Sequence, residues 1–260
     1  KNKINTIRKK DGTCDIYGII VEPFSASTML ASSEEFLYEI SDLCKKEDII
    51  LIFDEIYTGW SKCGELFYFM KYPDLIPDIL TMSKSIGGGK SSISAYVVKD
   101  KIFEQAYGNQ NDALLHTTTY NGFGEECITA IKAIEIIVRD DYPLKARNIY
   151  KKLNPALEEL KIKYPRLIKE IRGIGSLNGV MFKSPFEGIE NIISKIPMRF
   201  IQDKKTFINK LTTVSVMDYL YKEYGILTSV TPDKNNTLIS IMPSVIAEDS
   251  EIDYFISSFD

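Results

Sequence analysis

Three short apolar runs in the first part of the chain each end in an ionisable residue. GIIV is followed by Glu22, IILIF by Asp54 and ILTMS by Lys84. Strands that alternate with helices along a chain form a mainly parallel sheet, so these runs predict an α/β domain. Because the carboxyl ends of parallel strands meet at one edge of the sheet, we expect the two acids and the lysine to gather there.

The spacing of apolar residues gives the expected elements of this domain. A helix is predicted from Ser32, which would form a capping box with Glu35, to Asp48. The predicted strands are 17–22, 49–53, 79–82 and 95–98. A second helix is predicted over 124–138, and one of its faces would carry the apolar residues Cys127, Ile131, Ile134 and Val138.

A charge cluster and a proline, Asp140-Asp141-Tyr142-Pro143, predict a domain boundary. We therefore expect a first domain over 1–140 and a smaller α+β domain over 141–260. The predicted elements of the second domain are a helix over 144–170, strands around 175–182, a helix near 214–224, strands at 226–230 and 237–241, and a last helix from Glu248. The segment 184–206 fits no element and is predicted to be an insertion.

The charge and cysteine content exclude several function classes. The 260 residues carry a net charge of −4 without a long block of one sign, which argues against a surface for nucleic acid or anionic lipid. No apolar run is long enough to span a bilayer. Four cysteines without a C-x-x-C pair and a single histidine predict no zinc site. We expect a cytoplasmic protein with reduced thiols and small-molecule ligands. Since a strand follows soon after Lys1, we also expect the chain to be the latter part of a longer one.

The stretch TMSKSIGGGKSS, residues 81–92, permits two interpretations. GKSS resembles the end of a phosphate-binding P-loop, and IILIFDE resembles a Walker B strand. The P-loop pattern, however, requires a glycine where Lys84 stands, and the loop should precede its Walker B strand rather than follow it. The nucleotide-binding interpretation is therefore disfavoured, and Lys90 is expected to be a solvated residue.

The second interpretation uses the strand-end residues themselves. A lysine at a strand end can form a Schiff base with an aldehyde, and an aspartate one strand earlier can hold a protonated heterocyclic nitrogen. Pyridoxal phosphate needs this pair of groups. Alone, Asp54 is a common strand-end cap and Lys84 a common solvated charge, so the prediction depends on their combination.

Four blocks of sequence resemble the class III pyridoxal-phosphate aminotransferases of fold type I. They are LIFDEIYTGWSKCGELF, PDILTMSKSIGGG, HTTTYNGFGEECITAIKAIEII and IRGIGSLNGVMF, in the order of that family. The resemblance implies a partial large domain with a mainly parallel sheet and a smaller α+β domain at the C-terminal end. Nothing in the chain matches the family's N-terminal phosphate loop or the aromatic residue that stacks on the cofactor ring.

The resemblance also implies roles for particular residues. Lys84 would form the Schiff base and carry the proton, and Asp54 would pair with the ring nitrogen of pyridoxal 5'-phosphate. The other implied cofactor residues are Ile56 on a ring face, Tyr57, Glu22 near the ring, and Thr119 with its neighbour Thr118. Because the threonine reaches the phosphate of the neighbouring subunit, a homodimer with shared sites is expected.

The implied activity is amino-group transfer from an amine or amino acid to a carbonyl acceptor, by a ping-pong mechanism through aldimine and ketimine intermediates. Two alternatives stay open: an aminomutase of the same family, and a non-catalytic or carrier-linked domain that is similar to an aminotransferase.

The chain departs from the family at positions that contact ligands. Tyr57 stands where many members have a glutamine, and Phe123-Gly124 replaces Asn-Pro. Ile239 stands where many members have the arginine that binds the substrate carboxylate, and Ser27 where some have the glutamate that pairs with it. Since both partners are lost together, the usual recognition of glutamate and 2-oxoglutarate is not expected.

Overall fold

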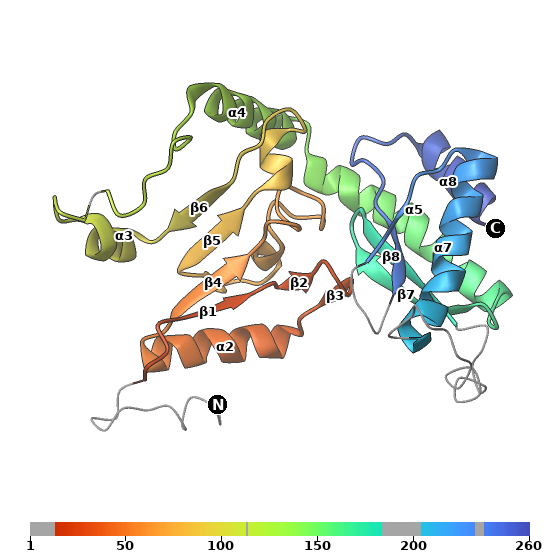
Figure 1. Cartoon of the computed structure of the whole chain (residues 1–260), viewed down its shortest axis with the longest axis horizontal. Helices are drawn as coiled ribbons and strands as arrows, with labels where there is room; N and C mark the ends of the chain where they lie inside the picture. Colours follow the sequence, from red (N-terminus) through yellow and green to blue (C-terminus); the bar gives the residue numbers. More distant parts are fainter. Residues whose placement is uncertain (1–13, 113, 184–203, 232–236) are drawn as a thin grey trace. The chain divides into compact units, whose positions relative to one another are not determined.

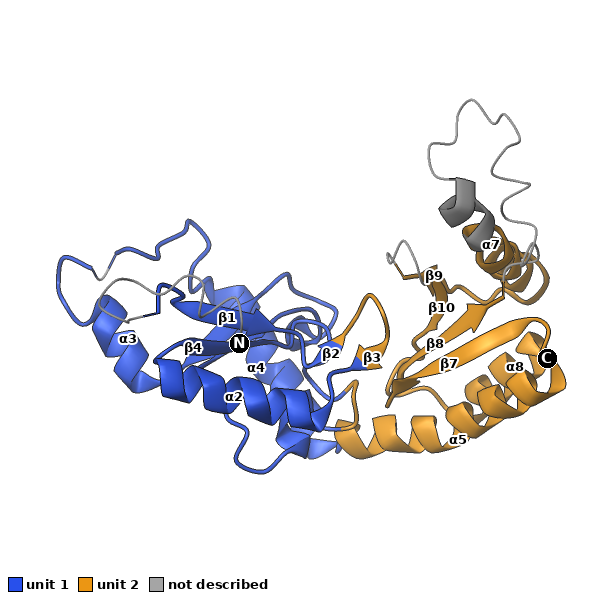
Figure 2. Ribbon diagram, turned by 90° about the horizontal axis from the view of Figure 1, so that it is seen from below, with its two compact units in different colours: residues 1–24, 31–61, 65–141 blue, residues 25–30, 62–64, 142–260 orange. Residues whose placement is uncertain are grey.

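The computed structural model describes residues 14–112, 114–183, 204–231 and 237–260. The chain divides into two compact units (Figure 2), one made of residues 1–24, 31–61 and 65–141, and the other of residues 25–30, 62–64 and 142–260. Most of the predicted insertion, 184–206, lies outside the described residues.

Unit 1 is built on a four-stranded sheet with the order β1(Gly18–Val21), β4(Ile50–Asp54), β5(Ile79–Met82) and β6(Ala95–Val98). The pairs β1–β4 and β4–β5 are parallel, and β6 runs antiparallel beside β5. The mainly parallel sheet expected from the sequence is therefore confirmed. Leu51 and Phe53 of β4 are buried, as an inner strand requires.

Helix α2(Glu34–Glu47) packs against β4 and buries Leu37, Ser41 and Cys44 (Figure 1). Its N-cap is Ser33, whose hydroxyl accepts a hydrogen bond from Phe36 N at 3.2 Å. The predicted capping box of Ser32 and Glu35 is therefore wrong, because the helix begins one residue later than the pattern suggested. Helices α3(Asp100–Tyr107) and α4(Gly124–Arg139) complete this unit.

The apolar face predicted for α4 is not the most buried face of this helix, and its residues Cys127 and Ile134 are half-buried. Ile131 and Val138 are 58% and 57% exposed, whereas Ala130, Ala133 and Ile137 are buried. A Cβ placed on Gly88 would lie 2.9 Å from Cβ of Ala133. The helix therefore contacts the turn after β5 through its small residues, which permit a closer approach than its large apolar residues would.

Unit 2 contains an antiparallel sheet with the order β7(Ile168–Ile174), β8(Leu177–Phe182), β10(Leu238–Ile241) and β9(Ser229–Val230). The helices of its described residues are α5(Tyr142–Lys163), α7(Lys204–Tyr224) and α8(Asp249–Phe259). The helix predicted over 144–170 ends at Lys163, because the proline at position 165 disfavours helical geometry at Tyr164. The chain then enters β7.

The core of unit 2 lies between this sheet and its helices. It joins Leu153 and Leu157 of α5 to Val180 and Ile239 of the sheet, and all four are fully buried. The segment 25–30 belongs to the same unit, and strands β2(Phe24–Ser25) and β3(Leu30–Ala31) at its ends pair with each other. In neither unit do the described residues include a helix with both the length and the apolar composition that crossing a membrane requires.

Candidate active site

The three ionisable residues predicted to meet at one sheet edge follow neighbouring parallel strands. Glu22 follows β1, Asp54 is the last residue of β4, and Lys84 lies just beyond β5. The strand order β1–β4–β5 therefore brings their backbones to the same edge. Val21 pairs with Phe53, and Asp54 pairs with Thr81, which fixes the register of the three strand ends.

The carboxylate of Asp54 is oriented by two hydrogen bonds to one of its oxygens. Its Oδ1 accepts from Ile56 N at 3.0 Å and from the Thr81 hydroxyl at 3.3 Å. From the described residues, Oδ2 accepts no hydrogen bond. Asp54 is half-buried, so a cationic N–H donor that reached Oδ2 would form a charge-assisted hydrogen bond partly shielded from water. Thr81 was missed in the sequence, although it is the polar member of the run ILTM.

Lys84 begins the short 3-10 helix η2(Lys84–Gly87), in a left-handed backbone conformation with φ 51°. Such a conformation is uncommon for a residue with a side chain, and it is held here by neighbouring contacts. The Ser83 hydroxyl donates to Ile93 O at 3.1 Å, and Gly88 N donates to Ser85 O at 3.0 Å. Lys84 itself is exposed, and its Nζ lies 5.9 Å from the centroid of the Tyr57 ring.

The Glu55 side chain stabilises the loop that follows Asp54 through three hydrogen bonds. Its carboxylate is fully buried and accepts from the Thr58 hydroxyl at 2.8 Å, Tyr68 N at 2.6 Å and Phe69 N at 2.8 Å. Burial raises the pKa of this carboxyl, and the three hydrogen bonds oppose that rise only in part. Glu55 therefore ties the residue after β4 to the start of η1(Tyr68–Lys71). Its position directly after Asp54 was visible in the sequence, but its partners were not.

Tyr57 lies within the part of the loop that Asp54 and Glu55 hold. The neighbouring Ile56 N is bound to Asp54, and Thr58 is bound to Glu55. The side chain of Tyr57 is half-buried, and this burial raises the pKa of the phenol above its usual value of 10.0. The ring therefore faces Lys84 as a neutral phenol at physiological pH.

The remaining predicted cofactor residues have fewer contacts with Asp54 and Lys84. Glu22 is exposed and Ile56 is half-buried. Thr118 and Thr119 are exposed in the loop between α3 and α4, where Thr118 O accepts from Asn121 N at 3.2 Å. Among the described residues, no hydrogen bond joins either threonine to Asp54 or Lys84. Asp54, Tyr57 and Lys84 are thus linked through local contacts, and the roles of the threonines stay predictions.

The two positions that the resemblance matches to a carboxylate-binding pair, Ser27 and Ile239, both lie in unit 2. Ser27 is half-buried, and its hydroxyl is 3.1 Å from that of Ser25. Ile239 is 0% exposed in the apolar core and pairs with Val180 on β8. The isoleucine side chain is therefore part of the core packing of this unit.

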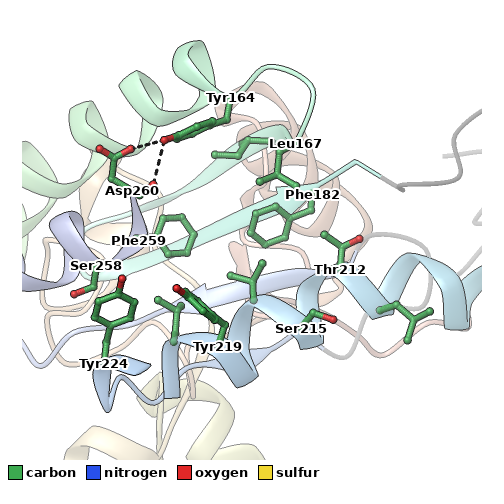
Figure 3. A pocket seen from close by; sticks show the side chains of 14 residues that line it. Tyr164, Leu167, Phe182, Thr212, Ser215, Tyr219, Tyr224, Ser258, Phe259 and Asp260 are labelled. Carbon is green, nitrogen blue, oxygen red and sulfur yellow. Dashed lines mark hydrogen bonds between the residues drawn. The ribbon is translucent and has the colours of Figure 1, made fainter. Parts of the chain in front are cut away.

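Unit 2 also contains an apolar pocket of about 710 Å³ between α7, the end of α8 and the sheet (Figure 3). Phe182, Tyr219 and Phe259 line it, and at its rim the Tyr164 hydroxyl donates to Asp260 Oδ1 at 3.0 Å. None of the predicted site residues lines this pocket. It is therefore separate from the set formed by Asp54, Tyr57 and Lys84.

Comparison with known proteins identifies the family. The family described as "Aminotransferase class-III" matches residues 1–260. The chain belongs to the class III aminotransferases. Among its relatives, Aminotransferase PigE of Serratia sp. is 24% identical over 98% of this chain and 32% of the relative. Putrescine aminotransferase of Pectobacterium atrosepticum is 31% identical over 69% of this chain and 39% of the relative.

Solved structures agree with this class III assignment at the level of the fold. An aminotransferase of Bacillus anthracis superposes with a TM-score of 0.75 and 25% identity, over 94% of this chain and 51% of that one. The fold is therefore that of the fold type I transaminases, as the sequence predicted. The chain spans about a third of the length of the curated relatives and about half of this solved chain.

The class III aminotransferases use pyridoxal 5'-phosphate, and the residues present at the sheet edge fit it. Asp54 has one oriented oxygen and one oxygen that accepts nothing from the described residues, which suits a protonated ring nitrogen. Lys84 offers an exposed primary amine that has no carboxylate within ion-pair distance in the described parts of the chain. A lysine without such a partner retains its amine for a covalent bond to an aldehyde.

Proposed function

We propose that the protein containing this chain is a pyridoxal-phosphate-dependent aminotransferase, which moves an amino group from an amine or amino-acid donor to a carbonyl acceptor. The observation that carries the proposal is the arrangement of Asp54 and Lys84 after adjacent parallel strands, with Asp54 held through Oδ1. Membership of the class III family supports the same reaction.

Each residue of the set then has a defined task. When bound, the cofactor supplies an aldehyde and an electron-withdrawing ring. Asp54 would accept a hydrogen bond from the protonated ring nitrogen through Oδ2 and so stabilise its charge. Lys84 would hold the cofactor covalently through Nζ and, when released by the donor, would move a proton with the same nitrogen. General acid–base work of this kind contributes a factor of about 10² to 10⁴.

The other predicted contacts complete the proposal. Ile56 would pack on a ring face, Glu22 would lie near the ring, and Thr119 with Thr118 would bind the phosphate of a neighbouring subunit. The protein would therefore be a homodimer with shared active sites, and we propose a cytoplasmic location. The division into a cofactor domain over 1–140 and a small domain over 141–260 is part of the same proposal.

Borohydride trapping tests the assignment of Lys84. The protein expressed from its full reading frame would be loaded with pyridoxal phosphate, reduced with borohydride, digested and analysed by mass spectrometry. The reduced cofactor should be found on the peptide that contains Lys84, and Lys84→Ala should abolish the adduct. An adduct that persists in Lys84→Ala, or that maps to Lys90, would contradict the assignment.

Donor and acceptor screening separates the alternatives. A transaminase should release a carbonyl product from the donor alone, in an amount equal to the bound cofactor, and turn over only when a carbonyl acceptor is added. An aminomutase should turn over a single substrate with no acceptor. A protein that binds the cofactor but passes no amino group to any acceptor, free or carrier-bound, would contradict both enzymatic functions.

A further inference from the structure

The Lys84 amine lies over an aromatic ring. Lys84 Nζ lies 5.9 Å from the centroid of the Tyr57 ring, within the range of a cation–π contact. Lys84 forms no ion pair with a carboxylate in the part of the chain that the structure describes. We propose that the Tyr57 ring is a positioning element that holds the protonated Lys84 side chain by a cation–π contact, before this side chain loses its proton and bonds to the cofactor. This proposal rests on the proposed role of Lys84 as the cofactor's tether.

The backbone of Lys84 is fixed, but its side chain is not. Lys84 adopts φ 51°, and the turn after it packs closely against Ala133 of α4 through Gly88. The ammonium, however, sits on a flexible four-carbon stem that is exposed to solvent. Without a partner, the amine would occupy many rotamers, and only some of them would reach a cofactor carbon.

The ring on the other side is held on both flanks. Ile56 N is bound to Asp54 at 3.0 Å, and the Thr58 hydroxyl is bound to the buried Glu55 at 2.8 Å. Gly59 N also donates to Glu55 O at 2.9 Å. Tyr57 is therefore carried on a short segment with little freedom, and its ring is half-buried against the site.

The ring, and not the hydroxyl, is the part that attracts the lysine. Because burial raises the pKa of the Tyr57 phenol, the side chain carries no negative charge at physiological pH and cannot form an ion pair with Lys84. The negative face of a neutral aromatic ring still attracts an ammonium ion. A phenylalanine should therefore replace Tyr57 in this task, whereas an aliphatic residue should not.

Holding the amine should matter whenever Lys84 is not bonded to the cofactor. At a half-buried site, a cation–π contact is worth roughly 1 kcal/mol, which corresponds to a factor of about five in the population of the held amine. Loss of the ring should reduce the rate at which Lys84 bonds to added cofactor by about that factor. In cofactor-free protein, the same loss should make the amine more accessible to small reagents.

The experiment compares three variants, Tyr57→Phe, Tyr57→Leu and Tyr57→Met, in the protein expressed from its full reading frame. The first keeps the ring and removes the hydroxyl; the other two remove the ring. Cofactor-free protein would be labelled by brief reductive methylation, and mass spectrometry would give the ratio of labelling at Lys84 to that at Lys90. Lys90 is exposed on the same turn and serves as an internal reference.

The expected ratio in Tyr57→Phe is within about twofold of the wild type, and in Tyr57→Leu and Tyr57→Met it rises about fivefold. Stopped-flow mixing with pyridoxal phosphate should show a bonding rate that falls about fivefold in the two ringless variants alone. Circular dichroism would confirm that the variants fold. Equal ratios in all four proteins, or a Tyr57→Phe ratio equal to that of the ringless variants, would overturn the proposal.

The labelling experiment and the borohydride experiment can fail independently of each other. If borohydride places no cofactor on Lys84 of the wild type, the function assigned to Lys84 is wrong. The labelling ratio in cofactor-free protein still reports whether the ring restrains the amine. If the labelling ratio changes in the ringless variants but no cofactor is found on Lys84, the contact between Tyr57 and Lys84 exists but has no role in catalysis.

Discussion

Thr81 and Asp54 are register partners on adjacent parallel strands, and the Thr81 hydroxyl donates a hydrogen bond to Asp54 Oδ1 at 3.3 Å. Together with the hydrogen bond from Ile56 N, this contact leaves Oδ2 as the oxygen of Asp54 that accepts nothing from the described residues. The orientation of the carboxylate therefore comes from β5 as well as from its own strand.

Replacing Thr81 with valine should weaken cofactor binding. The substitution keeps the shape of the side chain but removes the donor to Asp54 Oδ1, and a hydrogen bond to a charged group is worth about 1.5–3 kcal/mol when its geometry is good. Because this bond is long, we expect the dissociation constant for pyridoxal phosphate to rise about three- to tenfold. Absorbance titration of the cofactor-free protein measures it.

Thr81→Ser is the matched control, because serine keeps the hydroxyl. Its affinity for the cofactor should stay within about twofold of the wild type. A loss in the serine variant with none in the valine variant would mean that the methyl group, rather than the hydrogen bond, matters at this position.

The sequence predicted the ends of the strands well, because a strand inside the sheet must be apolar and a charged residue marks where its apolar run stops. A buried parallel strand needs continuous apolar residues, and Glu22, Asp54 and Lys84 mark where these apolar runs end. The buried face of α4 could not be predicted in this way. Ala130 and Ala133 are buried by a close approach to Gly88, and periodicity gives more weight to the larger Ile131 and Val138.

The sequence pattern likewise could not predict the contacts within the loop after β4. Glu55 binds backbone groups of Tyr68 and Phe69, more than ten residues away, and no local spacing predicts those partners. The contact between Tyr57 and Lys84 also depends on the path of this loop.

Glu55→Gln should destabilise the protein in a way that depends on pH. Its carboxylate accepts three hydrogen bonds, and a glutamine places an NH₂ group against some of those donors. Because burial raises the pKa of the folded Glu55 above the unfolded value of 4.5, the folded state binds this proton more tightly. The stability that this proton contributes is fully present below pH 4.5 and is lost as the pH rises through the folded pKa.

Urea unfolding of wild type and Glu55→Gln at several pH values measures this effect. The difference in the free energy of unfolding should be about 1–3 kcal/mol near pH 4.5 and should shrink as the pH rises. Glu35→Gln, an exposed acid of α2, should change stability by no more than about 0.5 kcal/mol. A difference for Glu55→Gln that grows with pH would contradict the raised pKa.

Ser61→Gly should stabilise the loop after β4. Ser61 has φ 86° and is 0% exposed, and its buried hydroxyl has no hydrogen-bond partner among the described residues. Glycine relieves the backbone strain and removes the unsatisfied hydroxyl, which together outweigh its greater entropy in the unfolded chain. We expect a gain of about 1 kcal/mol in the free energy of unfolding, measured with urea.

Ser61→Ala separates the effect of the backbone strain from the effect of the unsatisfied hydroxyl. Alanine removes the hydroxyl but keeps a Cβ at a positive φ, so its gain should be smaller than that of glycine. A loss of stability in Ser61→Gly would indicate that the hydroxyl makes a stabilising contact in solution.

Ile239→Arg should fail to create carboxylate recognition, although the sequence resemblance predicts an arginine at this position in the family. Ile239 is 0% exposed in the apolar core beside Val180 and Leu153, so an arginine there would bury an unpaired charge. The expected cost is about 3–5 kcal/mol in the free energy of unfolding, against about 0.5–1.5 kcal/mol for the control Ile239→Val. Urea unfolding measures both costs. An arginine variant as stable as the valine variant, with a lowered KM for an α-amino acid donor, would show that this position can turn toward the substrate.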